Sequence, residues 1–149
     1  LNSSWAKMLV VSDIDDTLKV SHVKSFFDNL ANAGKAGPVF RGMVEIYNEL
    51  VTANDLDLVY VTNAPESLMY SSHTHFVQYN GFPVRPIYFW TSGEQSQHKL
   101  DTISGLLESQ KYDSAVLIGD NGEKDTIIYA EIRKRYPQIP MKIFIRTLY

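Results

Sequence analysis

The sequence predicts an α/β fold built on a parallel β-sheet of five strands. Short, densely apolar segments alternate with helical patterns along the whole chain, an order typical of this fold class. The segments are rich in β-branched and aromatic residues, as expected of strands that helices cover on both faces. The predicted strands are Met8 to Val11, Leu58 to Val61, Pro86 to Trp90, Ala115 to Ile118 and Lys142 to Ile145.

Helical spacing of apolar residues predicts a helix between each pair of successive strands. Residues 18–39 are less regular and end in a Gly- and Pro-rich turn. With 149 residues and no repeat or linker, we expect residues 1–149 to form one domain around one core. The expected buried helix faces are Met43, Ile46, Tyr47 and Leu50; Leu68, His75, Phe76 and Tyr79; Leu100, Ile103, Leu106 and Leu107; and Ile127, Ile128, Ala130 and Ile132.

The composition excludes several classes of function. The chain carries 14 Lys and Arg against 17 Asp and Glu, a net charge of −3, so no nucleic-acid partner is expected. No apolar run approaches the roughly 18–20 residues of a membrane-spanning helix, which favours a soluble, cytoplasmic or peripherally membrane-associated protein. The absence of cysteine excludes disulfides, a thiol nucleophile and thiolate metal sites. Any chemistry must come from oxygen and nitrogen groups.

Three carboxylates follow the first predicted strand, at Asp13, Asp15 and Asp16. Like charges at the end of a buried strand are tolerated mainly when a cation or strong donors offset them. A polar turn with a helix-capping aspartate is the alternative. A calcium loop is excluded, because Leu18 and Lys24 stand where its template requires Gly and Glu.

Polar residues also follow two other strands. Thr62 and Asn63 come after the second strand. Asp120 and Asp125 follow the fourth strand. Lys99 precedes the fourth strand and lies near the start of a helix. Taken singly, each has an ordinary interpretation as a helix cap, a turn or a solvated lysine. If the first and fourth strands are neighbours, four aspartates converge and require a divalent cation. Oxygen ligands with a hydroxyl and a lysine nearby suit Mg²⁺, and the chemistry that they imply is phosphoryl transfer. These four are Asp13, Asp15, Asp120 and Asp125.

In order and setting, these residues resemble the four motifs of the haloacid-dehalogenase-type phosphatases: Asp-x-Asp-x-Thr at residues 13–17, a strand-end hydroxyl at Thr62, a lysine at Lys99, and Gly-Asp-x-x-x-x-Asp at residues 119–125. More narrowly, the chain resembles the catalytic domain of the actin-patch-associated, lipin-related phosphatidate phosphatases. It departs from that family at Thr62 and Asn121, where Ser is usual, and at residues 89–92. The resemblance implies a Rossmann-like three-layer sandwich.

The resemblance also implies catalytic roles. Asp13 would be the nucleophile that forms an aspartyl-phosphate intermediate. Asp15 would be the general acid and then the base, for which we expect a raised pKa. Thr62 and Lys99 would bind the phosphoryl oxygens.

A Mg²⁺ ion is implied with Asp13, the backbone carbonyl of Asp15 and Asp120 as ligands. Asp125 would position Lys99 or a water. Supporting roles are expected for Asp16, Thr17 and Asn63, and weaker ones for Gly122 and Arg146.

The intervals between motifs are too short for a full cap domain, and an uncapped site suits a large or membrane-bound phosphate ester. We therefore expect a Mg²⁺-dependent phosphomonoester hydrolase that acts on phosphatidate or a similar lipid phosphate. The alternatives are a phosphatase for phosphoprotein or nucleotide esters, a phospho-accepting signalling module, and a catalytically silent binding module. The signalling module is disfavoured because its acceptor aspartate follows the third strand, where this chain has Trp90, Thr91 and Ser92.

Three further features have structural interpretations that we favour. His73 and His75 have a spacing seen in metal sites, but residues two apart diverge on a helix, so we expect surface or core histidines. Basic residues 133–135 suit the last turn of a helix. An apolar lip for acyl chains is a hypothesis for Phe26, Phe27, Phe89 and Trp90, for which core packing is the favoured interpretation.

Overall fold

A computed structural model describes residues 7–19, 39–40, 42–53, 55–109 and 111–148 of the chain. The sheet consists of β1 (Met8–Ser12), β2 (Leu56–Pro65), β3 (Ile87–Trp90), β4 (Ser114–Asp120) and β5 (Met141–Arg146). The helices are α2 (Met43–Ala53), α3 (Glu66–Tyr79), α4 (His98–Glu108) and α5 (Asp125–Arg135), and a 3-10 turn, η1 (Gln95–Gln97), precedes α4. All five predicted strands are therefore confirmed.

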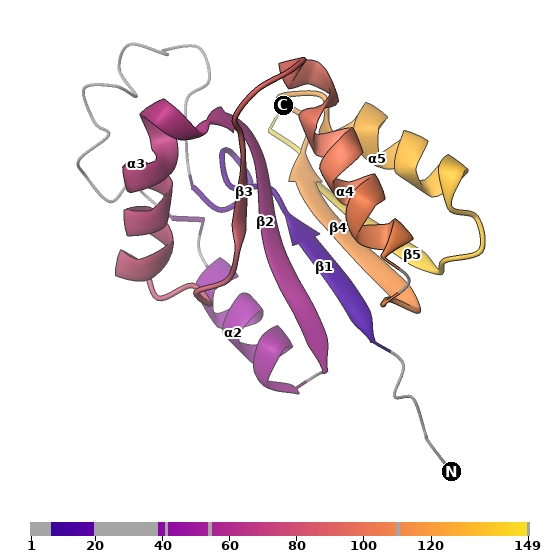
Figure 1. Ribbon diagram of the computed structural model, residues 1–149. Coiled ribbons are helices and arrows are strands. Elements are labelled where there is room, and N and C mark those ends of the chain that lie inside the picture. The colour runs from indigo at the N-terminus through magenta and orange to yellow at the C-terminus, as the bar shows by residue number, and fades with distance from the viewer. Residues whose placement is uncertain (1–6, 20–38, 41, 54, 110, 149) are drawn as a thin grey trace.

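The strands lie in the order β3-β2-β1-β4-β5 and pair in parallel throughout (Figure 1). The central strand β1 pairs with β2 on one side and with β4 on the other, so that Ser12 is level with Tyr60 and Ile118. The direction of winding reverses between β1 and β4, which meets the condition under which the aspartates after these strands were expected to converge. In open parallel sheets, ligands bind beyond the carboxyl ends of the strands at such a reversal.

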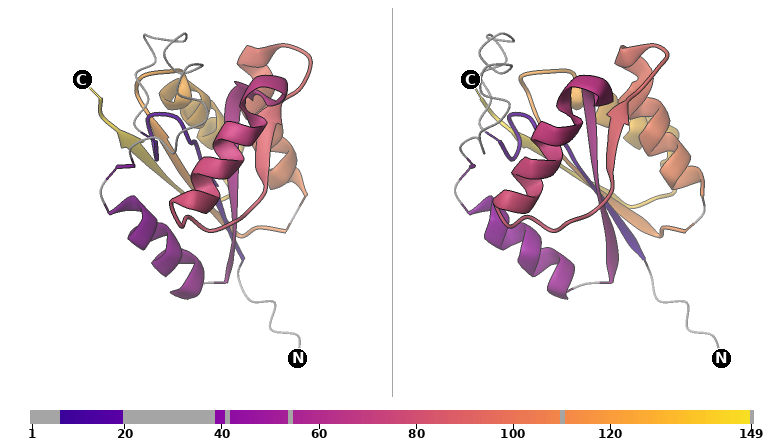
Figure 2. Two further views of the ribbon diagram at one scale, coloured as in Figure 1. Left: turned by 90° about the vertical axis from the view of Figure 1, so that its left-hand side faces the viewer. Right: turned by 60° about the vertical axis from the view of Figure 1, so that its left-hand side comes forward.

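Helices cover the two faces of the sheet as separate layers. Helices α2 and α3 lie on one face and α4 and α5 on the other (Figures 1 and 2). Alternate residues of β1 face the two layers, because side chains of a strand point to opposite faces in turn: Leu9 and Val11 pack with the core under α4 and α5, and Val10 with the core under α2 and α3. The result is the Rossmann-like three-layer sandwich implied by the motifs.

The predicted buried face of α4 is confirmed, but those of α2, α3 and α5 are partly wrong. On α2, Ile46 is 56% exposed. On α3, Leu68 and Tyr79 are 53% and 71% exposed, and the buried residues are instead Ser72, His73, Phe76 and Val77. Apolar spacing misleads here because a tyrosine can leave its ring at the surface with the hydroxyl in water. On α5, Ile127 is exposed, and Tyr129 is buried beside Ile128 and Ile132.

The interval between Thr62 and Lys99 holds only α3, β3 and η1, so the described residues form no cap domain there. Phe89 is 6% exposed, with its ring 5.8 Å from those of Tyr70 and His73, which supports core packing rather than an exposed lip. Trp90 is half-buried and donates its indole N–H to the Gly93 carbonyl. Phe26 and Phe27 lie outside the described residues. No helix within the described ranges is long and apolar enough to cross a membrane.

Two isoleucines of α5 test which face of this helix packs on the core. Ile132 is fully buried and Ile127 is 70% exposed. We expect Ile132→Ala to lower the free energy of unfolding by about 2–5 kcal/mol, because it removes buried methyl groups and leaves a cavity. Ile127→Ala should change it by less than about 0.5 kcal/mol. Urea unfolding measures both, and equal effects would contradict the assigned face of α5.

Candidate active site

The candidate site lies where the chain leaves β1 and β4, the two strands on either side of the winding reversal. The parallel pairing continues one residue past β1, where the amide of Asp13 donates to the carbonyl of Ile118 at 2.9 Å. The chain then turns sharply, with Asp16 at a φ of 55° and Leu18 donating its amide to the carbonyl of Ile14. This turn brings Thr17 back over the end of β1.

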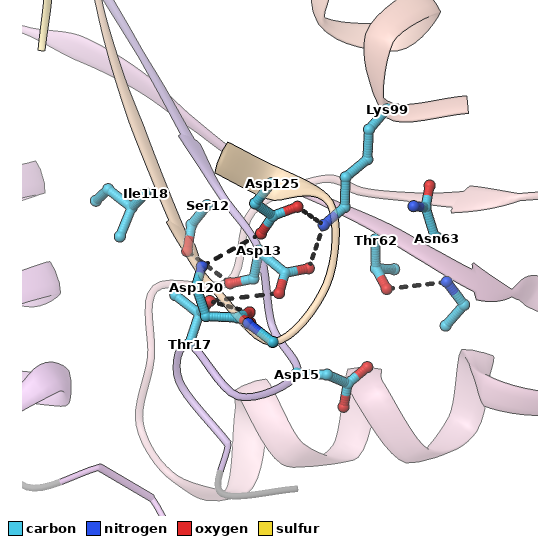
Figure 3. A network of polar contacts seen from close by, with 12 residues as sticks. Ser12, Asp13, Asp15, Thr17, Thr62, Asn63, Lys99, Ile118, Asp120 and Asp125 are labelled. Atoms are coloured by element: carbon cyan, nitrogen blue, oxygen red, sulfur yellow. Dashed lines mark hydrogen bonds and ion pairs between the residues drawn. The ribbon is translucent and has the colours of Figure 1, made fainter. Parts of the chain in front are cut away.

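Three of the predicted carboxylates meet here. Each of Asp13, Asp120 and Asp125 offers an oxygen, and these oxygens lie within 4.8 Å of one another (Figure 3). All three residues are at most 4% exposed. The Thr17 hydroxyl lies 3.3 Å from Asp13 Oδ2 and 3.2 Å from Asp120 Oδ2. This cluster, the carboxylate triad, can hold a metal ion through oxygen ligands.

The loop after β4 determines where Asp120 and Asp125 point. The amide of Gly122 donates to Asp120 Oδ1 at 2.6 Å, and the amide of Asp120 donates to Asp125 Oδ2 at 3.4 Å. A Cβ at position 119 would collide with the Asp125 carboxylate. Glycine at this position therefore lets the start of α5 approach the end of β4.

Lys99 enters the triad from the first turn of α4, as the sequence predicts for the third motif. Its Nζ lies 2.9 Å from Asp13 Oδ1 and 2.6 Å from Asp125 Oδ1, and the side chain is 1% exposed. Burial by itself lowers a lysine pKa, but Asp13 and Asp125 outweigh it and raise the pKa of Lys99 above its ordinary value. The ammonium is therefore fully charged at neutral pH.

One ammonium does not balance the negative charge of the triad. Burial raises the pKa of Asp13 well above its ordinary value, and the charge of Lys99 offsets this only in part. Burial also raises the pKa of Asp125. Raised carboxyl pKa values show that the site needs more positive charge to stabilise its anions. A divalent cation among oxygen ligands meets that need.

Asp15 lies apart from the carboxylate triad (Figure 3) and contacts α3 instead. Its Oδ2 lies 2.9 Å from Nε2 of His73. Burial raises the pKa of Asp15, but the contact with His73, together with the positive charges of Lys19 and Lys99, outweighs burial, and the pKa of Asp15 is lowered. The raised pKa expected from neighbouring carboxylates is therefore wrong: the nearest partner of Asp15 is an imidazole.

The end of β2 supplies Thr62 and Asn63. Thr62 is 2% exposed, and its hydroxyl oxygen accepts the amide of Ala64 at 3.0 Å. Asn63 Oδ1 is buried and has no hydrogen-bond partner among the residues that the structure describes. Both side chains lie next to the loop after β1, because β2 pairs with β1. Thr62 thus stands where a hydroxyl can meet an anion bound at Asp13.

Contacts of Ser12 and of Arg146 hold the loop after β1 in place. Ser12 Oγ donates to the carbonyl of Asp13 at 2.7 Å and lies 2.7 Å from the buried hydroxyl of Tyr47. Arg146 Nε donates to the carbonyl of Thr17 at 3.2 Å, and its guanidinium lies 3.8 Å from the centre of the Phe40 ring. From the sequence, Arg146 is expected to have only a weak role, and Ser12 and Tyr47 are not expected in the site. The only sequence signal for these two residues is that Ser12 directly precedes the acidic motif.

The remaining candidates agree with their structural interpretations. Residues 133–135 are exposed at the end of α5, where Arg135 pairs with Glu131 at 2.9 Å along the helix. His75 is exposed and stacks on Tyr79, whereas His73 is a core histidine. Asp16 is buried within the turn after β1.

Comparison with known proteins identifies relatives of this arrangement. Residues 8–147 match the family described as the catalytic domain of phosphatidate phosphatase APP1. An uncharacterized protein of Schizosaccharomyces pombe is 27% identical over 150 residues, which cover 93% of this chain and 25% of that protein. The chain thus spans about a quarter of the length of this relative.

Solved structures share the fold at low sequence identity. A chain in the structure of the Pnkp1/Rnl/Hen1 RNA repair complex superposes with a TM-score of 0.67 and 12% identity, covering 99% of this chain and 45% of that one. A second structure of the Pnkp1/Rnl/Hen1 complex gives a TM-score of 0.64 and 10% identity, with 49% of that chain covered. The fold is common to these proteins.

Binding of a divalent cation to the carboxylate triad should stabilise the folded chain. At a free concentration about 100 times its dissociation constant, a ligand adds about 2.7 kcal/mol to the free energy of unfolding. We expect Mg²⁺ to raise the melting temperature of the wild type and of Asp101→Asn, an exposed carboxylate on α4, but not of Asp120→Asn. An equal shift in all three proteins would contradict binding at the triad.

Protons should compete with the cation for the same oxygens. Because the pKa values of Asp13 and Asp125 are raised, these carboxylates take up protons at a pH above the ordinary value of 3.8. Metal affinity measured by calorimetry should therefore fall on acidification at pH values well above 3.8. A constant affinity down to that pH would contradict the raised pKa values.

Proposed function

Since the chain belongs to the family of the phosphatidate phosphatase APP1 catalytic domain, a family of phosphatases, we propose that it hydrolyses phosphate monoesters with Asp13 as nucleophile. The observation that carries the proposal is the buried ammonium of Lys99 between Asp13 and Asp125, beside the carboxylate of Asp120. The ammonium of Lys99 favours the ionised form of Asp13 against the effect of burial and offers positive charge where a phosphate would bind.

The cation that the triad can hold is assigned as Mg²⁺, because the donors are all oxygen and Mg²⁺ prefers carboxylates together with substrate phosphate oxygens. Asp13 and Asp120 would be its side-chain ligands, with the backbone carbonyl of Asp15. Asp125 then serves chiefly to hold Lys99. When bound, the cation neutralises charge so that an anionic nucleophile can approach an anionic ester.

In the first step, an oxygen of Asp13 attacks phosphorus in line, and the bond to the ester oxygen breaks. The proton of Asp15 goes to the departing alkoxide. Lys99 and the Thr62 hydroxyl stabilise the phosphoryl oxygens as their charge is redistributed. In the second step, Asp15 takes a proton from water as water attacks the aspartyl phosphate, and inorganic phosphate leaves with Asp13 restored.

The lowered pKa of Asp15 in the free site is compatible with both steps. As a carboxylate, Asp15 is the base that the second step requires. A bound phosphate ester brings negative charge close to Asp15, and nearby negative charge raises a carboxyl pKa. Substrate binding therefore favours the protonated form that the first step requires.

For the substrate, we propose phosphatidate or a similar lipid phosphate, following the family to which the chain belongs. The described part of the interval from Asn63 to His98 places no cap domain over the site, which suits an ester whose alcohol remains in a membrane. The protein would then act at a membrane surface.

A phosphate-release panel tests the proposal. We expect the wild type with Mg²⁺ to release phosphate from dispersed phosphatidate faster than from phosphopeptides or nucleotides. Asp13→Asn should lower the rate by about four orders of magnitude or more, because it removes the nucleophile. Asp101→Asn, a change on the surface of α4, is the matched control. Preference for phosphopeptides or nucleotides would overturn the substrate, and undiminished activity of Asp13→Asn would overturn the mechanism.

A further inference from the structure

A buried histidine contacts the proposed general acid, and no motif includes it. His73 lies in the middle of α3 and is 0% exposed. Its Nε2 lies 2.9 Å from Asp15 Oδ2, although the two residues are 58 positions apart. Its Nδ1 is buried with no hydrogen-bond partner in the described part of the chain.

A histidine in this position is a poor choice for stability alone. Leaving a buried polar atom unsatisfied costs about 1–3 kcal/mol, and the neighbouring core positions on α3 are filled by Phe76 and Val77 without that cost. A buried polar group retained at such a cost calls for another explanation. The contact with Asp15 supplies one.

The surroundings of His73 restrict its imidazole. Its ring lies 5.8 Å from the ring of Phe89, at an angle of 56°, and its own helix is packed on the core beneath it. A side chain held by packing presents its hydrogen-bonding atom in a constant direction. The Nε2 atom of His73 is therefore held in a fixed position and acts as an anchor for Oδ2 of Asp15.

We propose that His73 is a positioning residue that holds Asp15 in the orientation needed to protonate the leaving group. This inference rests on the proposed function and deepens it. The hydrogen bond occupies Oδ2 of Asp15, so the other oxygen, Oδ1, is the atom that meets the ester oxygen.

The positioning of Asp15 affects the breaking of one bond, that from phosphorus to the ester oxygen. In the first step, the bond from phosphorus to the ester oxygen breaks, a bond from phosphorus to Asp13 forms, and the proton on Asp15 Oδ1 moves to the ester oxygen. An alkyl ester depends on this proton, because an alkoxide is a poor leaving group. A nitrophenyl ester does not, because nitrophenolate is stable as an anion. Loss of the anchor should therefore impair alkyl esters selectively.

The test compares kcat/KM for a short-chain phosphatidate in micelles with that for p-nitrophenyl phosphate. We expect His73→Phe, which keeps a ring but removes the hydrogen bond, to lower kcat/KM for phosphatidate by about 10- to 100-fold, a part of the 10²–10⁴ that general acid catalysis contributes. The value for p-nitrophenyl phosphate should stay close to that of the wild type. His73→Gln should restore most of the loss, because its amide nitrogen reaches nearly as far as Nε2.

Three comparisons make the result decisive. His75→Phe changes an exposed histidine of the same helix and should alter neither substrate. In an Asp15→Asn background, His73→Phe should cause no further loss on phosphatidate, since His73 acts through Asp15. If His73→Phe does not fold, as shown by circular dichroism, His73→Asn replaces it, because its shorter amide does not reach Asp15.

Equal losses on both esters, or no loss on phosphatidate, would overturn the positioning role. Failure of the proposed function has a different signature: the wild type would then release phosphate from neither ester in a manner that depends on Asp13. A wild type active on both esters with an unchanged ratio in His73→Phe leaves the phosphatase function intact and rejects only the role of His73.

Discussion

The buried ion pairs of Lys99 with Asp13 and Asp125 are the interaction on which the site depends. They join the loop after β1, the first turn of α4 and the start of α5 around one ammonium that is 1% exposed. Removing one partner from a buried pair is strongly destabilising, because an uncompensated charge remains. The same pairs leave the triad short of positive charge, which is the condition under which a divalent cation binds. The same ion pairs thus stabilise the fold and form part of the candidate site.

The sheet order makes this arrangement possible. Asp13 and Asp120 lie more than 100 residues apart in the chain, yet they follow two strands that pair directly, β1 and β4. Each strand delivers its carboxylate to the same edge, and the amides of Asp13 and Gly122 hold the two loops in place. The paired strands thus hold the two carboxylates in a fixed geometry, which the proposed reaction requires.

Asp15 shows that neighbours in sequence do not define the environment of a residue. Two positions from Asp13, it lies outside the carboxylate triad, and a histidine of α3 lowers its pKa. The pKa values of two aspartates of one motif therefore shift in opposite directions: burial raises that of Asp13, whereas at Asp15 the contact with His73 and the charges of Lys19 and Lys99 outweigh burial. Separate partners for the two carboxylates suit separate roles for them.

The sequence by itself determined the five strands, because apolar density is a local signal with a strong physical basis. The adjacency of β1 and β4 was only a condition of the expected site until the tertiary structure showed it, and Lys99 was placed in the site by the resemblance to the phosphatase motifs rather than by a local signal. Only the tertiary structure decided which face of α3 is buried, since the tyrosines and histidines of that helix satisfy either environment. That face carries His73 to Asp15, and the pairing has no local signal because the two residues meet only through the packing of α3 on the sheet. For the same reason, Ser12 and Tyr47 meet only when α2 packs on the sheet.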